Sequence, residues 1–254
     1  MSEIRQQPEA PTALRQLAGG ERIDLHVHDD HQIVYAAAGV NSITTDQGTW
    51  VAPATRAIWV PARTPHAHRA YGETALHLVG LTDNPLGLNK PAVLSVHPLL
   101  RELIIAYTDD PSDDSAPRHR LRAVLLDQLQ LSTEQTALRL PAPRDSRLAA
   151  VCAILNTTPA DNRSLSALGS AVGASERTLS RLFRTEFAMT FPQWRTQLRL
   201  HHALILLADS HPVTTVALTC GWSTPSAFIH TYKQTFTTTP GQRRAGAPTR
   251  GAKY

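Results

Sequence analysis

One apolar pattern occurs twice in the C-terminal part of the chain, at residues 165–187 and again at 213–236. Each copy predicts a short amphipathic helix, a tight turn and a second amphipathic helix, because apolar residues lie three or four positions apart on both sides of a glycine. That glycine is Gly173 in the first copy and Gly221 in the second. The copies correspond position by position, apart from one residue inserted in the second turn. A repeated helix-turn-helix unit therefore makes this part of the chain an all-α domain.

The second helix of each unit has a start signal. Ser175 precedes one helix and Thr224 the other, and a hydroxyl at that position accepts a hydrogen bond from an unpaired backbone amide. Pro225 follows Thr224 and suits the first helical position. Residues 193–208 lie between the units and predict one continuous helix. Such a helix would hold two recognition helices at the spacing of successive major grooves of DNA, roughly 34 Å.

The predicted helix after Ser175 exposes a basic face. A guanidinium fork matches both acceptors on the edge of guanine, so this face favours a DNA major groove over a merely solvated surface. Arg195, Arg199 and Arg243 are expected to contact phosphates or to be plain surface. The side chains on the basic face are those of Arg177, Ser180, Arg181 and Arg184.

The net charge of +4 conceals a split between the halves of the chain. Residues 1–140 contain 12 Lys and Arg against 16 Asp and Glu, a net of −4, whereas residues 141–254 contain 13 against 5, a net of +8. This split indicates that only the C-terminal half binds a polyanion. The chain has no run of about eighteen apolar residues, no apolar signal-peptide core, and two distant cysteines that need no disulfide. We therefore expect a cytoplasmic protein with no membrane partner.

The stretch from about residue 145 to 244 resembles the AraC/XylS family of bacterial transcription regulators. The matching segments are 179–184, 191–194, 198–200, 203–207, 216–228 and 239–244. The chain departs from the family pattern at Gly169, where alanine is usual, and at Ala188 and Thr237, where glycine is usual. The resemblance implies sequence-specific binding to double-stranded promoter DNA, with RNA polymerase as a partner if the protein is an activator.

By the same resemblance, Arg177, Ser180 and Arg181 occupy base-facing positions of the first recognition helix. In the second recognition helix, the matching positions include Ser226 and His230, with Lys233 nearby as a phosphate contact or plain surface.

Residues 23–79 are rich in predicted strands. Short apolar or alternating runs are separated by turn signals, which is typical of a sandwich or barrel of the jelly-roll kind. Residues 1–20 are expected to be a flexible leader. The expected strands are 23–27, 32–38, 41–45, 49–52, 57–60, 66–70 and 75–81, with turns that include 38–39 and 71–72.

This half resembles the cupin sensor domain, of the AraC-binding type, found in one branch of the same family. His26-Val-His28 with Gln32 is similar to the first cupin motif, with glutamine in place of the usual glutamate. Residues 61–66 are similar to the second motif, except that Arg63 replaces its glycine.

Two imidazoles at alternate strand positions share one face of the sheet. The cupin resemblance places His66 opposite that pair, so the three histidines, with Gln32 as a weak fourth ligand, suit zinc, nickel or iron. The alternative is a pocket in which the same residues bind a small molecule without a metal. His68 is not expected to be a ligand. The predicted ligand-binding residues are His26, His28, Gln32 and His66, and the predicted metal ligands are His26, His28 and His66.

Two further amphipathic helices are expected at 98–107 and 120–131. Their apolar stripes exceed what a small barrel needs to cover one end, so we expect a homodimer through these helices. The alternative is that both stripes pack on their own barrel. The stripe residues are Leu99, Leu100, Leu103, Ile104, Leu125, Leu126 and Leu129.

The sequence thus predicts an α+β multidomain protein, with a cupin β-barrel of the jelly-roll type, following helices, and an all-α double helix-turn-helix domain. The expected segments are a leader (1–20), the cupin sensor (21–90), a helical dimerisation segment (91–140), a linker (141–147), the DNA-binding domain (148–244) and a flexible tail (245–254).

The predicted function is transcription regulation, in which the cupin domain senses a small molecule or a metal and modulates promoter binding. The alternative is a metal-dependent cupin oxygenase or isomerase fused to a DNA-binding domain. The motif glutamate is missing and an enzyme has no use for a DNA-binding half, so we expect no catalysis.

Overall fold

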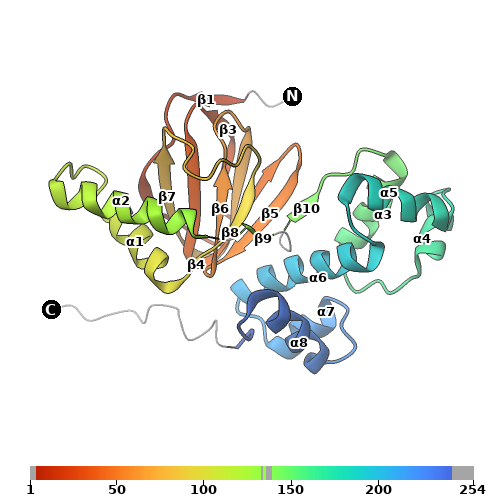
Figure 1. Ribbon diagram of the computed structural model, residues 1–254. Coiled ribbons are helices and arrows are strands. Elements are labelled where there is room, and N and C mark those ends of the chain that lie inside the picture. Colours follow the sequence, from red (N-terminus) through yellow and green to blue (C-terminus); the bar gives the residue numbers. More distant parts are fainter. Residues whose placement is uncertain (1–3, 133, 136–138, 242–254) are drawn as a thin grey trace.

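The computed structural model describes residues 4–132, 134–135 and 139–241 (Figure 1). The predicted tail 245–254 and Arg243 lie outside the described residues. The strands are β1 (Arg5–Gln7), β2 (Ala13–Leu17), β3 (Arg22–His28), β4 (His31–Thr45), β5 (Gly48–Pro53), β6 (Arg56–Val60), β7 (His66–Leu81), β8 (Ala92–Ser95), β9 (Glu134–Gln135) and β10 (Arg139–Pro141). The helices are α1 (Pro98–Asp109), α2 (Ala116–Gln130), α3 (Ser146–Thr157), α4 (Leu165–Ala171), α5 (Glu176–Phe187), α6 (Phe191–Ala208), α7 (Val213–Thr219) and α8 (Pro225–Phe236).

Within the described residues, the strands form one curved ten-stranded sheet, built around the long antiparallel pair β4 and β7. The turns predicted at 38–39 and 71–72 are wrong, because β4 and β7 each continue through these positions as one strand. The pairing of β4 with β7 shifts register on both sides of Ala38, which identifies bulges. Gly39 has a φ of +71°, and a Cβ there would collide with the Thr74 hydroxyl, so the glycine serves a bulge and not a turn.

The prediction of a flexible leader is also wrong for much of residues 1–20. β1 pairs in parallel with β3, and β2 pairs antiparallel with β7. Between them, the Ala10 amide donates a hydrogen bond to Asp30 Oδ2 at 3.2 Å. These two short strands expose most of their side chains, so no alternating apolar pattern marks them in the sequence.

The sheet also extends beyond the predicted cupin boundary at residue 90. β8 pairs with β6, β9 pairs with β8, and β10 pairs with β5, although all three lie in the segments predicted as helical or as the linker. Only residues 142–145 connect β10 to α3.

Helices α1 and α2 lie against one face of the sheet (Figure 1). Most of the apolar stripe that predicted a dimer is therefore buried within the chain, packed with Tyr35 and Trp59 of the sheet. Leu99 keeps 52% of its surface exposed, and Val124 and Leu131 keep 43% and 72%. The buried stripe residues are Leu100, Leu103, Ile104, Leu125 and Leu129.

The helical domain has two cores that share α6. The first contains α3, α4, α5 and the beginning of α6. The second contains the end of α6 with α7 and α8, and it is continuous with the interior of the sheet lobe. At this junction the backbone of Gly72 in β7 packs against Ala208, and the Gly72 amide donates to Asp209 Oδ1 at 3.2 Å. Among the described residues, no helix has the length and apolarity required to cross a membrane.

Candidate functional site

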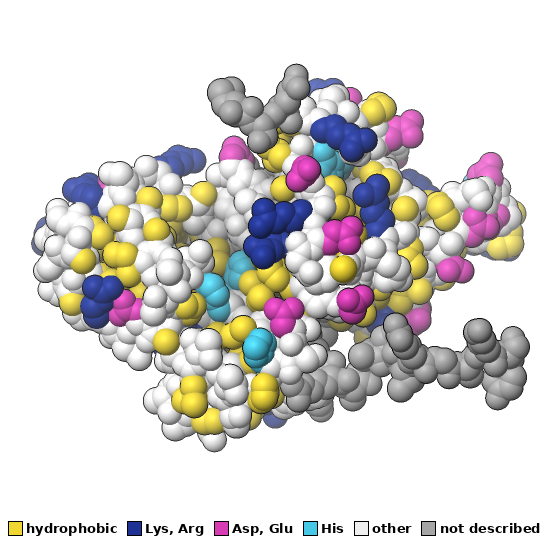
Figure 2. All heavy atoms as spheres, turned by 180° about the vertical axis from the view of Figure 1, so that it is seen from behind, with side chains coloured by type: hydrophobic (Ala, Val, Ile, Leu, Met, Phe, Trp, Pro, Cys, Tyr) yellow, Lys and Arg dark blue, Asp and Glu magenta, His cyan; other side chains and the backbone are white. Residues whose placement is uncertain are grey.

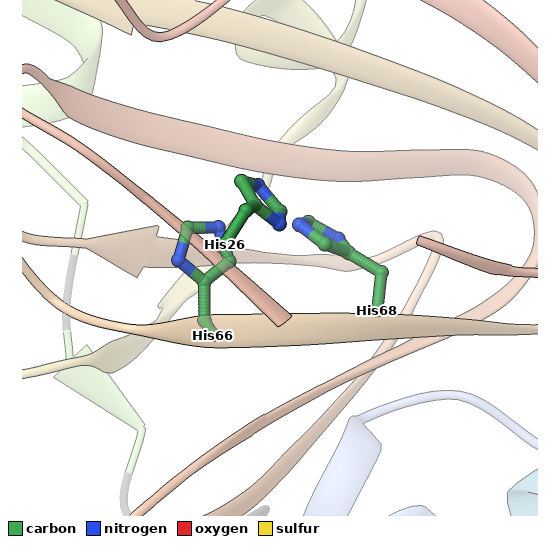
Figure 3. A group of neighbouring side chains, drawn as sticks. All are labelled: His26, His66 and His68. Atoms are coloured by element: carbon green, nitrogen blue, oxygen red, sulfur yellow. The ribbon is translucent and has the colours of Figure 1, made fainter. Parts of the chain in front are cut away.

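Four histidines of the sheet lobe face its interior from two neighbouring strands. His26 and His28 lie on β3, and His66 and His68 lie on β7, where alternate residues point to the same side. The antiparallel register places His26 opposite His66. Figure 3 shows His26, His66 and His68 pointing toward one another from these strands.

The tightest group contains His26, His66 and His68, whose potential ligand nitrogens all lie within 4.8 Å of one another. His28 lies beside this group, with its ring centroid 5.0 Å from that of His66 and 5.9 Å from that of His26. The structure thus differs from the prediction that left His68 out of the site. The pairing of β3 with β7 shifts register between Ile23 and His26. The three imidazoles form a triangle, with ring centroids 4.3 Å (His26 to His66), 5.6 Å (His26 to His68) and 5.0 Å (His66 to His68) apart.

Backbone carbonyls fix the tautomers of three of these imidazoles. Nδ1 of His26 lies 2.8 Å from the Asp24 carbonyl, Nδ1 of His28 lies 2.7 Å from the Asp30 carbonyl, and Nδ1 of His66 lies 2.8 Å from the Thr64 carbonyl. A carbonyl oxygen only accepts, so each Nδ1 carries the proton and each neutral ring keeps its lone pair on Nε2. This arrangement is the one that orients histidine for metal binding.

Several polar atoms of the site have no partner within the described part of the chain. They include Nε2 of His28 and of His66, which are the lone-pair nitrogens defined by the tautomers. Oε1 of Gln32 and Oδ1 of Asn41 are also buried without a hydrogen-bond donor. Buried polar atoms without partners are costly, so the unpartnered Nε2 atoms of the neighbouring His28 and His66 indicate a place for a bound group.

His26, His66 and His68 are neutral near pH 7. Burial, together with the smaller effect of the neighbouring imidazoles of His26 and His28, lowers the pKa of His66 to about 3. Burial also lowers the pKa of His26, and it holds the pKa of His68 well below the ordinary value. Neutral imidazoles are competent metal ligands and hydrogen-bond partners, so the donor set fits a borderline divalent ion.

The first recognition helix, α5, presents the predicted basic face. Ser175 caps it by accepting from the Thr178 amide at 3.2 Å, as predicted. Arg177, Arg181 and Arg184 are exposed, and within the part of the chain that the structure describes their guanidinium groups make no hydrogen bond or ion pair. Ser180 is half-buried on the same side. The opposite face is buried through Leu179, Leu182, Phe183 and Phe187.

The second recognition helix, α8, repeats this design. Thr224 accepts from the Ala227 amide at 3.2 Å, and Pro225 occupies the first turn. Ser226, His230 and Lys233 are exposed. The buried side is formed by Phe228, Tyr232 and Phe236.

Two arginines that were expected at phosphates or on plain surface bind within the protein. Arg195 donates to the Arg163 carbonyl at 3.1 Å and lies over the Phe191 ring. The Arg199 guanidinium is held between the two helix-turn-helix units by three hydrogen bonds. Sequence reasoning missed this role because the acceptors are mostly backbone carbonyls, which every sequence contains.

The positions that depart from the family pattern have structural explanations. Ala188 and Thr237 end α5 and α8 with φ of 55° and 60°, the left-handed conformation that favours glycine. A Cβ at Gly169 would collide with the Ala174 carbonyl, so glycine there allows α4 to pack closely against the turn before α5.

A strand-rich lobe with a polar interior, joined to two helix-turn-helix units with exposed recognition helices, defines a ligand-responsive DNA-binding protein. Residues 12–82 match the family described as AraC-like ligand binding domain, and residues 168–246 match the one described as helix-turn-helix domain. The chain belongs to the AraC/XylS family of transcription regulators. These matches confirm the predicted cupin-like sensor, the DNA-binding domain and a regulatory function, and they contradict the enzyme alternative.

Curated relatives are transcription regulators as well. The HTH-type transcriptional regulator NimR of Escherichia coli is 29% identical over 223 residues, which cover 86% of this chain and 81% of that protein. The HTH-type transcriptional regulator RipA of Corynebacterium glutamicum is 35% identical over 119 residues, which cover 44% of this chain and 35% of that protein. Among solved structures, ToxT from Vibrio cholerae aligns with a TM-score of 0.41 and 8% identity, over 94% of this chain and 98% of that one.

Proposed function

We propose that the histidine cluster of the sensor lobe binds a divalent transition metal (zinc, nickel or iron), and that occupancy of this site modulates promoter binding. The observation that supports it is the fixed tautomer of His26, His28 and His66, which leaves each Nε2 as a lone-pair donor inside the lobe. His26, His66 and His68 would hold the ion, and His28 is close enough to exchange with one of them.

The ligand set carries no charge, so a bound divalent ion would keep its full +2 charge. Such a site attracts an anionic or oxygen-donor effector to an open coordination position. The runner-up is a small polar molecule bound directly by the same imidazoles. The unpartnered oxygens of Gln32 and Asn41 favour it, because they accept hydrogen bonds from a ligand but are weak ligands of these metals.

Elemental analysis of protein purified without a chelator or a histidine tag tests the metal. We expect about one equivalent in the wild type, and much less in His66→Ala and in the double variant His26→Ala/His28→Ala. His119→Ala is the matched control, since His119 is exposed and pairs only with Asp114 at the surface. A content below about a tenth of an equivalent, not raised by reconstitution, would leave only the small-molecule version.

We assign base contacts to side chains on the solvent-facing sides of both recognition helices. Arg177, Ser180 and Arg181 read the first half-site, and Ser226 and His230 read the second, whereas Arg184 and Lys233 at the far ends of the helices contact phosphates. Double-stranded promoter DNA is thus the main partner, and RNA polymerase is a second one if the protein activates transcription.

We also propose a homodimer through α1 and α2. Its support is now the exposed apolar set Leu99, Val124 and Leu131, because the other stripe residues pack inside the chain. Light scattering on the full chain tests it, with Leu99→Glu/Leu131→Glu expected to give a monomer. A wild type that is already monomeric at tens of micromolar excludes this dimer.

We place the protein in the cytoplasm, where promoter DNA is found. Both cysteines are free, and burial raises the pKa of Cys152 and of Cys220 to about 12. Such thiols are inert packing groups, and they fit a reducing compartment.

A further inference from the structure

Arg199 lies on α6, the helix that both helix-turn-helix units share. Its guanidinium reaches the loop between α3 and α4, which belongs to the first unit. Nε donates to the Pro159 carbonyl at 3.1 Å, and Nη2 donates to the Asp161 carbonyl at 3.4 Å and to Asn162 Oδ1 at 2.8 Å. These three bonds fix the guanidinium plane relative to the first unit.

The other side of the same guanidinium supports the second unit. Gly221 begins the turn between α7 and α8, with a φ of +89°. A Cβ on Gly221 would lie 2.8 Å from Arg199 Nη2 and 2.8 Å from Ala160 Cα, so the turn rests directly on the guanidinium and on the loop of the first unit. Trp222 and Ser223 continue this turn and line a surface hollow with Arg199 and Asn162.

Burial of a charged guanidinium at this position costs desolvation free energy. Burial lowers the pKa of Arg199, and within the described residues its guanidinium forms no ion pair. The nearby carboxylate of Asp161 is held by Arg163 at 2.6 Å. Neutral oxygen acceptors must therefore offset the desolvation, and only the planar arginine fork presents several donors in the required directions.

We propose that Arg199 sets the spacing and relative rotation of the two recognition helices, and so the distance between the half-sites that the protein accepts. The proposal rests on the DNA contacts assigned to α5 and α8. The first unit has its own apolar core, separate from that of the second. Apolar packing between the two units therefore does not fix the angle between them, and this angle depends on α6 and on the polar contacts of its side chains. Arg199 is a positioning residue, since its side chain is turned to protein groups.

The consequence is a measurable dependence on operator spacing. One inserted base pair moves the second half-site by about 3.4 Å and rotates it by about 35° around the duplex. A rigid pair of units cannot follow this change, whereas a pair released from the guanidinium can pivot about α6. Loss of Arg199 should therefore reduce discrimination between spacers more than it reduces recognition of each half-site.

The experiment uses duplexes selected by the wild-type full chain from a random library, remade with one base pair added to or removed from the spacer. We expect the wild type to lose at least about tenfold in affinity on either change, and Arg199→Ala to lose less than about threefold. Arg195→Ala is the matched control, because Arg195 lies one turn earlier on α6 and binds the Arg163 carbonyl and the Phe191 ring, which both belong to the first unit. It should keep the wild-type ratio.

Asn162→Ala removes one acceptor and provides a milder variant if Arg199→Ala does not fold; it should give an intermediate ratio. Arg199→Lys should not restore the wild-type ratio, because an ammonium group cannot serve three acceptors in different directions. An unchanged spacer ratio in Arg199→Ala, or in Asn162→Ala where that is the only folded variant, would overturn the proposal. Arg181→Ala distinguishes this from failure of the assigned DNA contacts, since it should lose base preference while keeping the spacer ratio.

Discussion

Ala188 is a left-handed residue at the end of the first recognition helix, and replacing it with glycine should stabilise the protein. Its φ and ψ are 55° and 29°. The Ala188 amide donates to the Arg184 carbonyl at 3.1 Å, and the Met189 amide donates to the Phe183 carbonyl at 3.3 Å. The first bond, from the left-handed residue to the carbonyl four positions earlier, is that of the αL motif, in which glycine is preferred because it has no Cβ to crowd the following carbonyl.

The magnitude follows from two opposing terms. A left-handed alanine costs about 1–2 kcal/mol in the folded state. Glycine relieves this strain, but about 0.5–1 kcal/mol of the gain in stability is lost because the unfolded chain has more conformational entropy with glycine than with alanine. Ala188→Gly should therefore raise the free energy of unfolding by about 0.5–1 kcal/mol, which corresponds to a rise in Tm of roughly 1–4 °C.

Thermal and urea unfolding of the full chain measure this change, with Ala153→Gly as the matched control. Ala153 is exposed in the interior of α3, a right-handed helix where glycine should lower stability by about 1 kcal/mol. Thr237→Gly should stabilise in the same direction as Ala188→Gly, since Thr237 is also left-handed and is branched at Cβ. The reasoning is refuted if Ala188→Gly lowers the midpoint as the control does. DNA affinity should stay unchanged, because Ala188 is outside the basic face.

Two further predictions concern the two sites. Arg181→Ala should cost about 1–3 kcal/mol on the selected operator and relax preference at one base position, and isotherms on specific and scrambled duplexes at several salt concentrations would reject the assignment if specific affinity is retained. Acidification should destabilise the sensor lobe: the pKa values of His26, His66 and His68 in the folded protein lie below 6.5, so the unfolded chain takes up protons first. Stability should therefore fall as the pH drops below about 6.5, by up to about 1.4 kcal/mol per pH unit from His66 until the pH nears 3. His26 and His68 act in the same direction. Urea midpoints that do not change between pH 7.5 and 5.5 would contradict the neutral state of these imidazoles.

The helices of the DNA-binding domain could be predicted because their signals in the sequence are local. The caps Ser175 and Thr224 act within three residues of themselves, and the apolar spacing of α5 and α8 reports directly which side is buried. Such features depend on neighbours in the chain, so the sequence contains what is needed to place them.

Features that depend on distant partners were harder to predict. β1 and β2 are extended because they pair with β3 and β7, which are distant in the sequence, and their own side chains are mostly exposed. The strand through Gly39 looked like a turn because a glycine at positive φ serves a bulge as well. His66 and His68 are two residues apart and so share a strand face, but the sequence does not show that β3 places His26 against both of them.

The strand that carries His66 and His68 also contacts α6, the helix that both helix-turn-helix units share. β7 begins with His66 and His68. A few residues further on, its Gly72 packs against Ala208, and the Gly72 amide donates a hydrogen bond to the Asp209 carboxylate. Ala208 ends α6, and the apolar core of the sheet lobe continues into α7 and α8 without interruption. Packed interiors favour discrete arrangements over continuous deformation, so a bound group that moves the histidines closer together would also move β7 and the end of α6 that packs on it.

Whether operator affinity rises or falls depends on whether the occupied cluster strengthens or weakens the contact of Gly72 with Asp209. Operator affinity of Asp209→Ala, measured with and without zinc, identifies which of these occurs, because the variant removes the contact while leaving both sites intact.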